Sequence, residues 1–121
     1  MPRIVLPHHH GEVTQGLFER LPESEELRLV SDLFKEMSDS SRIRIFWLLC
    51  HCEECVSNLS AMVDMTAPAV SHHLARLKAS GLVVSRREGK EVYYTAAQTR
   101  KAQLLHHMIE DLVEITCPEQ E

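Results

Sequence analysis

The sequence predicts a mainly α-helical domain with one small β-hairpin, and three observations support this expectation. Residues 66–81 have the pattern of a short helix with one apolar side. Residues 56–63 form a second short helical pattern just before it, separated by a tight turn at 64–65. Two β-rich runs, 82–87 and 91–95, follow on either side of a turn at 88–90. This order of elements is typical of a winged helix-turn-helix, which we expect to dimerise through its terminal helices.

The helix at 66–81 has clear signals at both ends. Thr66 is expected to be the N-cap, because its hydroxyl can accept a hydrogen bond from a free amide of the first turn. Pro68 fits that turn, where no amide hydrogen is needed. Gly81 is suited to end the helix in a left-handed conformation. The apolar side consists of Val70, Leu74 and Leu77.

The other side of this helix, together with the hairpin tip, carries groups that can contact DNA. Hydroxyl, imidazole and guanidinium groups can meet base edges in the major groove, and basic groups on a hairpin can meet phosphates. An ordinary surface helix is the alternative explanation for the helix alone. The predicted DNA-binding residues are Thr66, Ser71, His72, His73, Arg76, Arg86, Arg87 and Lys90.

The chain before this motif supplies two longer helices. Ser24 precedes two acidic residues and is expected to open the first of them. Residues 38–41 break that helix and cap the next one, at 42–50, which is apolar nearly all round and should lie in the core. Residues 51–55 are expected to be a connector, and Ser57 is expected to cap the short helix at 56–63.

A long helical pattern covers residues 97–116 and has more apolar surface than a small domain needs to cover its own end. We expect it to pack against the same helix of a second copy, giving a homodimer; packing on its own core alone is the alternative. The predicted organisation is an N-terminal arm at 1–22, the winged helix-turn-helix domain at 23–117, and a tail at 118–121.

Composition limits the class of protein. The chain has 121 residues, 44% of them hydrophobic, and a net charge of −5, but residues 67–94 contain five Lys or Arg and only two acids. A locally positive region on an acidic chain is compatible with DNA binding. No apolar run reaches the length of a membrane span, and the N-terminus does not look like a signal peptide, so we expect a cytoplasmic protein. No catalytic motif indicates an enzyme.

Three of the four cysteines, Cys50, Cys52 and Cys55, fall within six positions, and the fourth is Cys117. Clustered cysteines in a cytoplasmic chain are more typical of metal or redox chemistry than of structural disulfides. Cys52 and Cys55 form a Cys-x-x-Cys pair, whose thiolates can reach one soft cation. The alternative is that Cys50 belongs to the core while Cys52 and Cys55 are partly exposed free thiols.

Four stretches of the chain carry recognisable motifs: 39–45 (DSSRIRI), 70–77 (VSHHLARL), 81–83 (GLV) and 86–94 (RREGKEVYY). Together they resemble the ArsR/SmtB family of bacterial metal-sensing repressors. The first is similar to the family's D-x-x-R-x-x-I/L motif, the second to its V-S-H-Q/H-L-x-x-L recognition helix, and the last two to its hairpin. The resemblance implies a dimeric repressor that holds double-stranded operator DNA and is released when a metal ion binds. Ala67, Pro68 and Ala69 depart from the polar residues that members often have early in the recognition helix.

The resemblance also implies two possible metal sites. At the first site, Cys55 matches one cysteine of the family's C-V-C signature, and Ser57 stands where the other would be. Cys52 could replace the missing cysteine as a ligand. In such relatives the N-terminal arm supplies the further ligands. The predicted ligands are Cys52, Cys55, His8 and His10, with His9 also possible and His51, Glu53 and Glu54 as local substitutes.

This mixture of thiolate and imidazole suits Zn(II) or Cd(II) as the effector. The family's second site would lie on the last helix. Its early positions here are Gln98 and Arg100, so only a rearranged site is possible, for which the candidate ligands are His107, Asp111 and Glu114. The functional alternative to metal sensing is a winged-helix repressor whose cysteines sense redox or reactive sulfur species.

Overall fold

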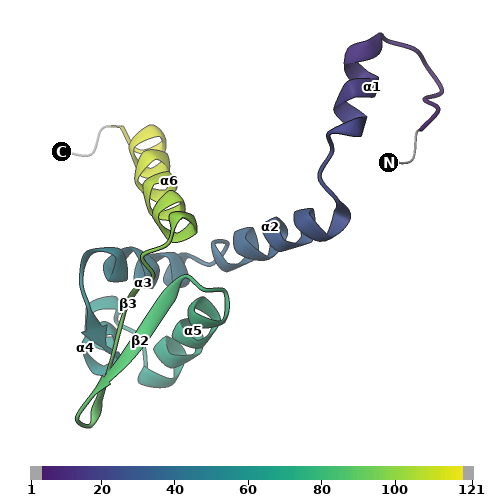
Figure 1. The fold of residues 1–121 in the computed structure, drawn as a ribbon. Coiled ribbons are helices and arrows are strands. Elements are labelled where there is room, and N and C mark those ends of the chain that lie inside the picture. Colours follow the sequence, from purple (N-terminus) through teal and green to yellow (C-terminus); the bar gives the residue numbers. More distant parts are fainter. Residues whose placement is uncertain (1–3, 119–121) are drawn as a thin grey trace. The chain divides into compact units, whose positions relative to one another are not determined.

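The computed structural model describes residues 4–118 and divides the chain into two compact units, 1–32 and 33–121. The first unit contains helix α1 (Glu12–Glu19) and most of helix α2 (Ser24–Glu36), which continues into the second unit (Figure 1). Part of the predicted arm, residues 1–3, and most of the predicted tail, residues 119–121, lie outside the described residues. Ser24 opens α2, as the sequence predicts.

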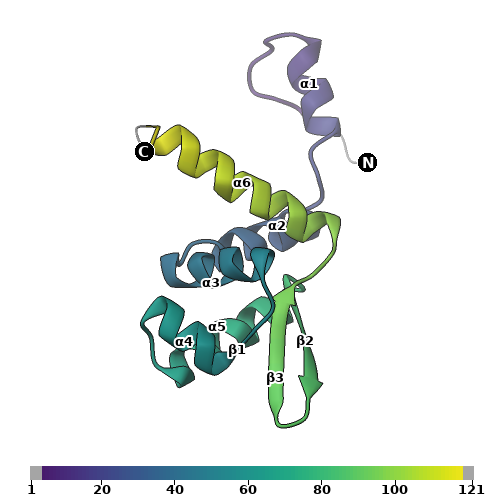
Figure 2. The same cartoon turned by 90° about the vertical axis from the view of Figure 1, so that its left-hand side faces the viewer.

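The second unit holds the remaining helices and a small sheet, in the predicted order (Figures 1 and 2). The expected mainly α-helical winged helix-turn-helix is therefore confirmed. After the end of α2, the elements are α3 (Ser40–His51), β1 (Glu54–Cys55), α4 (Val56–Val63), α5 (Ala67–Ala79), β2 (Val83–Glu88), β3 (Glu91–Ala96) and α6 (Arg100–Thr116).

Side chains cap three of these helices. Thr66 caps α5 by accepting a hydrogen bond from the amide of Ala69 at 3.3 Å, as predicted. Asp39 caps α3 in the same way, accepting from the amide of Arg42 at 2.9 Å. The last helix begins at Arg100, three residues later than predicted, because the hydroxyl of Thr99 is its N-cap.

The cap predicted for α4 is wrong. The helix begins one residue before Ser57, at Val56, and its N-cap residue is Cys55, which makes no side-chain capping bond. At the other end, Asp64 adopts the left-handed conformation with φ 54° and forms the tight turn toward α5.

The sheet is antiparallel with the strand order β1-β3-β2. Glu88 pairs with Glu91, so Gly89 and Lys90 form the hairpin loop, and Gly89 has the positive φ of 62° that such a tight turn requires. The hairpin extends beyond helices α4 and α5 (Figure 2). The third strand, β1, was not predicted: Cys55 pairs with Tyr93, so part of the expected connector belongs to the sheet.

The core lies between α3, α4, α5 and the base of the hairpin. On α3, Ile45 and Phe46 are fully buried, which confirms this helix as the central one. The predicted stripe of α5 is buried as well, and α6 contributes Ala102 and Leu105. Within residues 4–118, no helix is both long enough and apolar enough to cross a membrane.

Candidate DNA interface and effector site

The recognition helix α5 has one buried side and one free side. Val70, Leu74 and Leu77 are completely buried in the core, whereas Ser71 and His72 are exposed. The hydroxyl of Thr66 is exposed at the first turn, although its oxygen already accepts the capping bond. This arrangement leaves polar groups free to meet base edges, as in other helices that enter a major groove.

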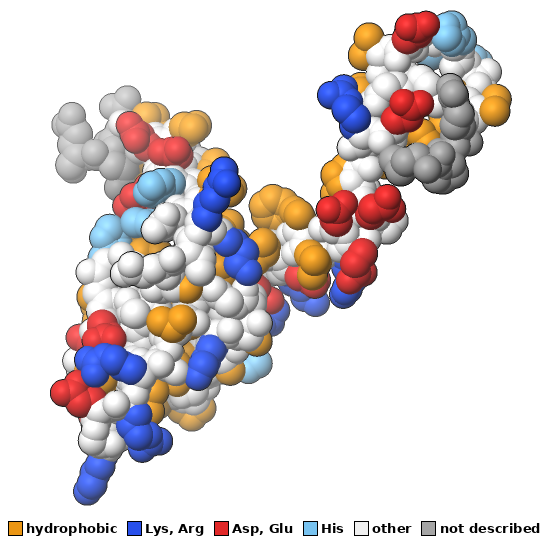
Figure 3. Space-filling model, in the orientation of Figure 1, with side chains coloured by type: hydrophobic (Ala, Val, Ile, Leu, Met, Phe, Trp, Pro, Cys, Tyr) orange, Lys and Arg blue, Asp and Glu red, His pale blue; other side chains and the backbone are white. Residues whose placement is uncertain are grey.

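The far end of the hairpin is basic. Lys and Arg side chains mark this end of the molecule in Figure 3. Arg87 and Lys90 are exposed, and neither has an ion-pair partner among the described residues. Free cations on a protruding hairpin are suited to contact phosphates.

Arg86 differs from these two because it is already bound within the chain. Its guanidinium donates two hydrogen bonds to the carboxylate of Glu53, at 2.8 and 2.7 Å, and a third to Glu88 at 2.7 Å. It also lies over the ring of Tyr93, 5.0 Å from the ring centroid. These two acidic partners hold the pKa of Arg86 above its usual value. Arg86 therefore fixes the connector to the hairpin.

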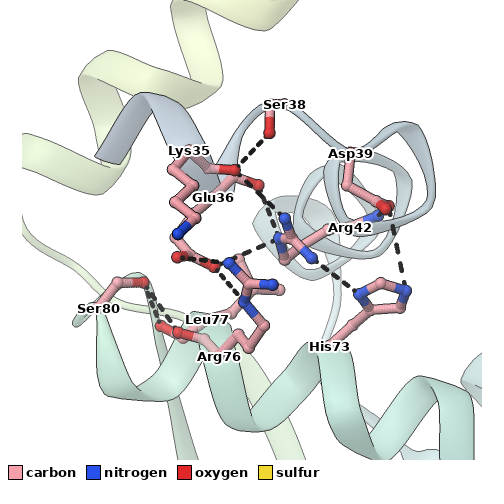
Figure 4. Close-up of polar contacts among 9 residues, drawn as sticks. All are labelled: Lys35, Glu36, Ser38, Asp39, Arg42, His73, Arg76, Leu77 and Ser80. Atoms are coloured by element: carbon pink, nitrogen blue, oxygen red, sulfur yellow. Dashed lines mark hydrogen bonds and ion pairs between the residues drawn. The ribbon is translucent and has the colours of Figure 1, made fainter. Parts of the chain in front are cut away.

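Arg76, another predicted DNA contact, points toward the protein (Figure 4). Its guanidinium donates two hydrogen bonds to Glu36 at the end of α2, at 3.0 and 3.2 Å. Glu36 is largely buried, with 14% of its side chain exposed. A two-point contact of this kind fixes both position and orientation, so it holds α5 against the end of α2.

His73 belongs to the same network. Arg42, which is buried at the start of α3, donates to the Nδ1 atom of His73 at 3.2 Å and to the carbonyl oxygens of Glu36 and Lys35. Because Nδ1 accepts this bond, we assign the ring proton to Nε2, which lies 4.0 Å from the carboxylate of Asp39. Burial is the largest cause of a lowered pKa for His73, with Arg42 nearby acting in the same direction and Asp39 opposing it. His73 is therefore neutral at pH 7.

The sequence did not reveal this network, although one signal was available. Arginine is almost never fully buried unless it is paired, so Arg42 in an otherwise apolar helix called for partners. The pairing of Glu36 with Arg76 could not be identified, because the two residues lie 40 positions apart along the chain.

The cysteines of the predicted metal site lie at the two ends of the connector between α3 and α4. Cys52 follows the last residue of α3, and its thiol donates to the carbonyl oxygen of Leu48 at 3.2 Å. Cys55 lies in β1, and both side chains are half-buried. All four cysteines are free.

Burial affects the chemistry of two of these thiols. It raises the pKa of Cys50 to about 11, with the carboxylate of Glu110 as the second cause. It also raises the pKa of Cys52, with a smaller contribution from Glu54. Both groups are therefore protonated at pH 7. Cys50 packs against the core, as the alternative reading of the cysteines expects.

The predicted histidine ligands belong to the first unit. His8 and His10 are exposed, and their ring centroids are 6.0 Å apart. These histidines lie in the first unit and the cysteines in the second, and the pairing of the two groups stays a prediction.

The residues considered for a rearranged site on the last helix, His107, Asp111 and Glu114, are all exposed on α6. A different group converges in the second unit: the ligand atoms of His51, His106 and Glu110 lie within 4.8 Å of one another. Part of this group could have been found in the sequence, because His106 and Glu110 are four residues apart and so lie on one side of a helix. The contribution of His51 depends on how α3 and α6 pack.

These features define the class of the protein: a transcriptional regulator with a winged helix-turn-helix DNA-binding fold. The family model described as "Bacterial regulatory protein, arsR family" matches residues 39–85. The chain is 30% identical to the transcriptional repressor SmtB homolog of Synechocystis, over 94% of this chain and 86% of that protein. The chain belongs to the ArsR/SmtB family, whose members compared here are transcriptional regulators and not enzymes.

Other relatives match over shorter regions. The regulator KmtR of Mycobacterium tuberculosis is 34% identical over 67% of this chain and 62% of its own length. The cadmium resistance regulatory protein CadC of Listeria innocua is 42% identical over 54% of this chain and 56% of its own length. The chain thus spans less than two thirds of these two relatives.

Two solved structures share the fold. HlyU from Vibrio cholerae has a TM-score of 0.66 and 30% identity, covering 78% of this chain and 99% of that one. An ArsR-family domain from Mycobacterium bovis, described as homodimeric, has a TM-score of 0.70 and 26% identity, covering 81% of this chain and 90% of that one.

Proposed function

We propose that this protein is a homodimeric repressor that binds double-stranded operator DNA through α5 and the β2–β3 hairpin, and leaves the DNA when an effector ion binds. The observation that carries the proposal is the division of α5. Its apolar stripe is completely buried, and Ser71 and His72 face solvent on the other side. A helix anchored in this way presents a fixed set of polar groups to a major groove.

The predicted DNA-binding residues divide into two groups in this proposal. The first group contacts DNA directly: Thr66, Ser71 and His72 read base edges, and Arg87 and Lys90 contact phosphates. The second group is already bonded within the chain and orients the helix and the hairpin: His73, Arg76 and Arg86.

Exposed apolar side chains on α6 support the dimer. Leu104 is 61% exposed and Ile115 is 74% exposed, and Leu112 and Val113 are exposed as well. Burying these side chains against the same helix of a second copy removes apolar surface from water, which favours association. Two copies related by a two-fold axis would present two recognition helices to the two halves of an operator.

For the effector we propose Zn(II) or Cd(II), bound by Cys52 and Cys55 with His8 and His10 from the N-terminal arm. The connector supplies two thiols, and the histidines of the N-terminal arm would add imidazole ligands. Two thiolates with two imidazoles form a ligand set that suits these ions. Cys52 must turn away from the carbonyl of Leu48 to take part. Metal binding must also remove the thiol protons, so affinity falls as the pH is lowered. The relative CadC is named as a cadmium resistance regulatory protein.

Sensing of redox or reactive sulfur species is the second candidate function. A neighbouring structure is described as reduced HlyU, and this chain also has free cysteines. The raised pKa of Cys50 and Cys52 lowers the fraction of thiolate, which oxidation and metal binding both require, so this shift does not separate the two candidates. We place the metal-responsive repressor first because the chain offers imidazole side chains as further ligands beside the thiols.

The decisive experiment measures DNA binding and thiol content together. A labelled promoter fragment from the protein's own genomic neighbourhood is titrated by fluorescence anisotropy, with and without Zn(II) or Cd(II). We expect binding without metal, release on adding one equivalent per chain, and protection of two thiols from a thiol-reactive dye. Release by an oxidant with no response to metal would favour the second candidate. A monomer that binds no fragment would refute the proposal.

A further inference from the structure

A second group of metal-ligating side chains lies away from the cysteines, between α3 and α6. His51 is the last residue of α3, and His106 and Glu110 are one helical turn apart on α6. The two Nε2 atoms are 3.1 Å apart. The Oε2 atom of Glu110 is 3.5 Å from Nε2 of His51, and its Oε1 atom is 3.4 Å from Nε2 of His106. Three potential ligands from two helices thus point at one small volume.

The separations match those between neighbouring ligands of a tetrahedral ion. With metal–nitrogen and metal–oxygen bonds of about 2.0–2.1 Å, two ligand atoms of such a site are about 3.3 Å apart. The distance between the two nitrogens and the two nitrogen–oxygen distances lie close to this value. The two nitrogen–oxygen distances involve different oxygens of Glu110, so the carboxylate either binds through both oxygens or rotates to present one. Hydrogen bonding explains them less well, because only the contact between the two imidazoles falls in the normal range of about 2.7–3.2 Å.

The ligands are held by elements that are themselves fixed. The ring of His51 packs on Trp47, with centroids 4.3 Å apart, and meets the ring of His106 edge-on at 4.8 Å. The hydroxyl of Thr95 donates to the carbonyl oxygens of Leu49 and Cys52, which fixes the end of α3 to the hairpin. Side chains on packed helices hold a metal geometry better than side chains on loops.

The donor set also limits the kind of ion. Imidazole suits Zn(II), Ni(II) and other borderline ions, whereas Ca(II) and Mg(II) need mainly oxygen ligands. The group contains a single carboxylate and no thiolate. His51 and Glu110 are partly exposed, so water can complete the coordination.

We propose that His51, His106 and Glu110 bind a borderline divalent cation, Zn(II) foremost, at a site separate from the Cys52–Cys55 pair. The bound ion joins the end of α3 to the middle of α6. Because it binds the folded chain and not the unfolded one, it raises the thermal unfolding temperature. This site does not depend on the DNA-binding function proposed above.

The test uses the full chain in a background that lacks the proposed ligands of the Cys52–Cys55 site. That background replaces the following residues, cysteines by Ser and histidines by Gln: Cys52, Cys55, His8, His9 and His10. Isothermal titration with Zn(II) should give one ion per chain, and Co(II) should give visible absorption bands without thiolate-to-metal charge transfer. Binding should also raise the unfolding temperature, and above the Kd the rise should follow the logarithm of the free ion concentration.

His106→Gln and Glu110→Gln then test the assignment, with His107→Gln, the exposed neighbour on the same helix, as the matched control. Each of the first two should weaken Zn(II) binding at least about tenfold, whereas the control should not. Circular dichroism establishes that all variants are folded. Absence of binding in the background protein, equal affinity in all variants, or a thiolate charge-transfer band would overturn the proposal. DNA binding is measured separately, so failure of this site leaves the proposed repressor function untouched.

Discussion

Replacing Glu36 by Gln should lower the stability of the second unit substantially, because this carboxylate is the shared partner of two arginines. It accepts two hydrogen bonds from Arg76, and one of its oxygens lies 3.4 Å from Nε of Arg42. Glu36 and Arg42 are 14% and 5% exposed, while Arg76 is 34% exposed. The neutral amide would leave both positive charges without a counter-charge.

The expected magnitude follows from this burial. Breaking a fully buried ion pair costs about 3–5 kcal/mol, and an exposed pair contributes about 0–1 kcal/mol. Arg76 is partly exposed and Arg42 keeps its bonds to two carbonyl oxygens, so we expect about 2 kcal/mol. For a domain of this size, that lowers the unfolding temperature by about 10 °C.

Thermal and urea unfolding followed by circular dichroism measure this change. Glu25→Gln is the matched control, because Glu25 pairs with Arg28 on the exposed surface of α2, and its unfolding temperature should not move. A cycle with Arg76→Gln separates the part due to that arginine, with an expected coupling of about 1 kcal/mol or more. If Glu36→Gln unfolds at the same temperature as the control, the network does not hold α5 in place.

Three further predictions concern single side chains. The pKa of His73 is lowered in the folded chain, so protonation of His73 favours the unfolded chain. The stability that the neutral side chain contributes is present above about pH 6.5 and is lost as the pH falls through the folded pKa. In the His73→Gln variant, the unfolding temperature should therefore depend less on pH over this range. Arg87→Ala should weaken DNA binding for all sequences and reduce the dependence of the binding affinity on salt concentration. Arg86→Ala should have a smaller effect on this salt dependence, because Arg86 is already paired with two carboxylates. Salt titrations of DNA binding by the two variants test this order. Cys55→Ser should leave DNA binding intact and abolish release by metal, as measured by anisotropy; release that persists would place the sensing site elsewhere.

Several features that depend on near neighbours could be predicted from the sequence, although the cap predicted at Ser57 was wrong. Thr66 and its amide partner are three residues apart, and so are Asp39 and Arg42. The turn at Gly89 likewise follows from the local preference for a positive φ. Each of these signals is complete within a few residues, so no knowledge of the folded chain was needed.

Features that depend on distant partners could not be predicted. β1 has two residues and exists only because Cys55 meets Tyr93 of a later strand. Arg76 looked like a DNA contact because its position on the helix is polar, yet its partner Glu36 is 40 positions away. His51 and His106 are 55 positions apart and meet only when α3 packs on α6.

The pairing of β1 with β3 has a consequence for any experiment on the connector. Cys55 sits beside Tyr93 in the sheet, and the next strand places Arg86 opposite the same tyrosine. We therefore expect a bulky label or an oxidised sulfur on Cys55 to press on β3, which carries one side of the hairpin. On this expectation, chemical modification of the thiol disturbs the basic tip even when no ion is involved, so a replacement of nearly equal size, such as serine, is the better test of its role as a ligand.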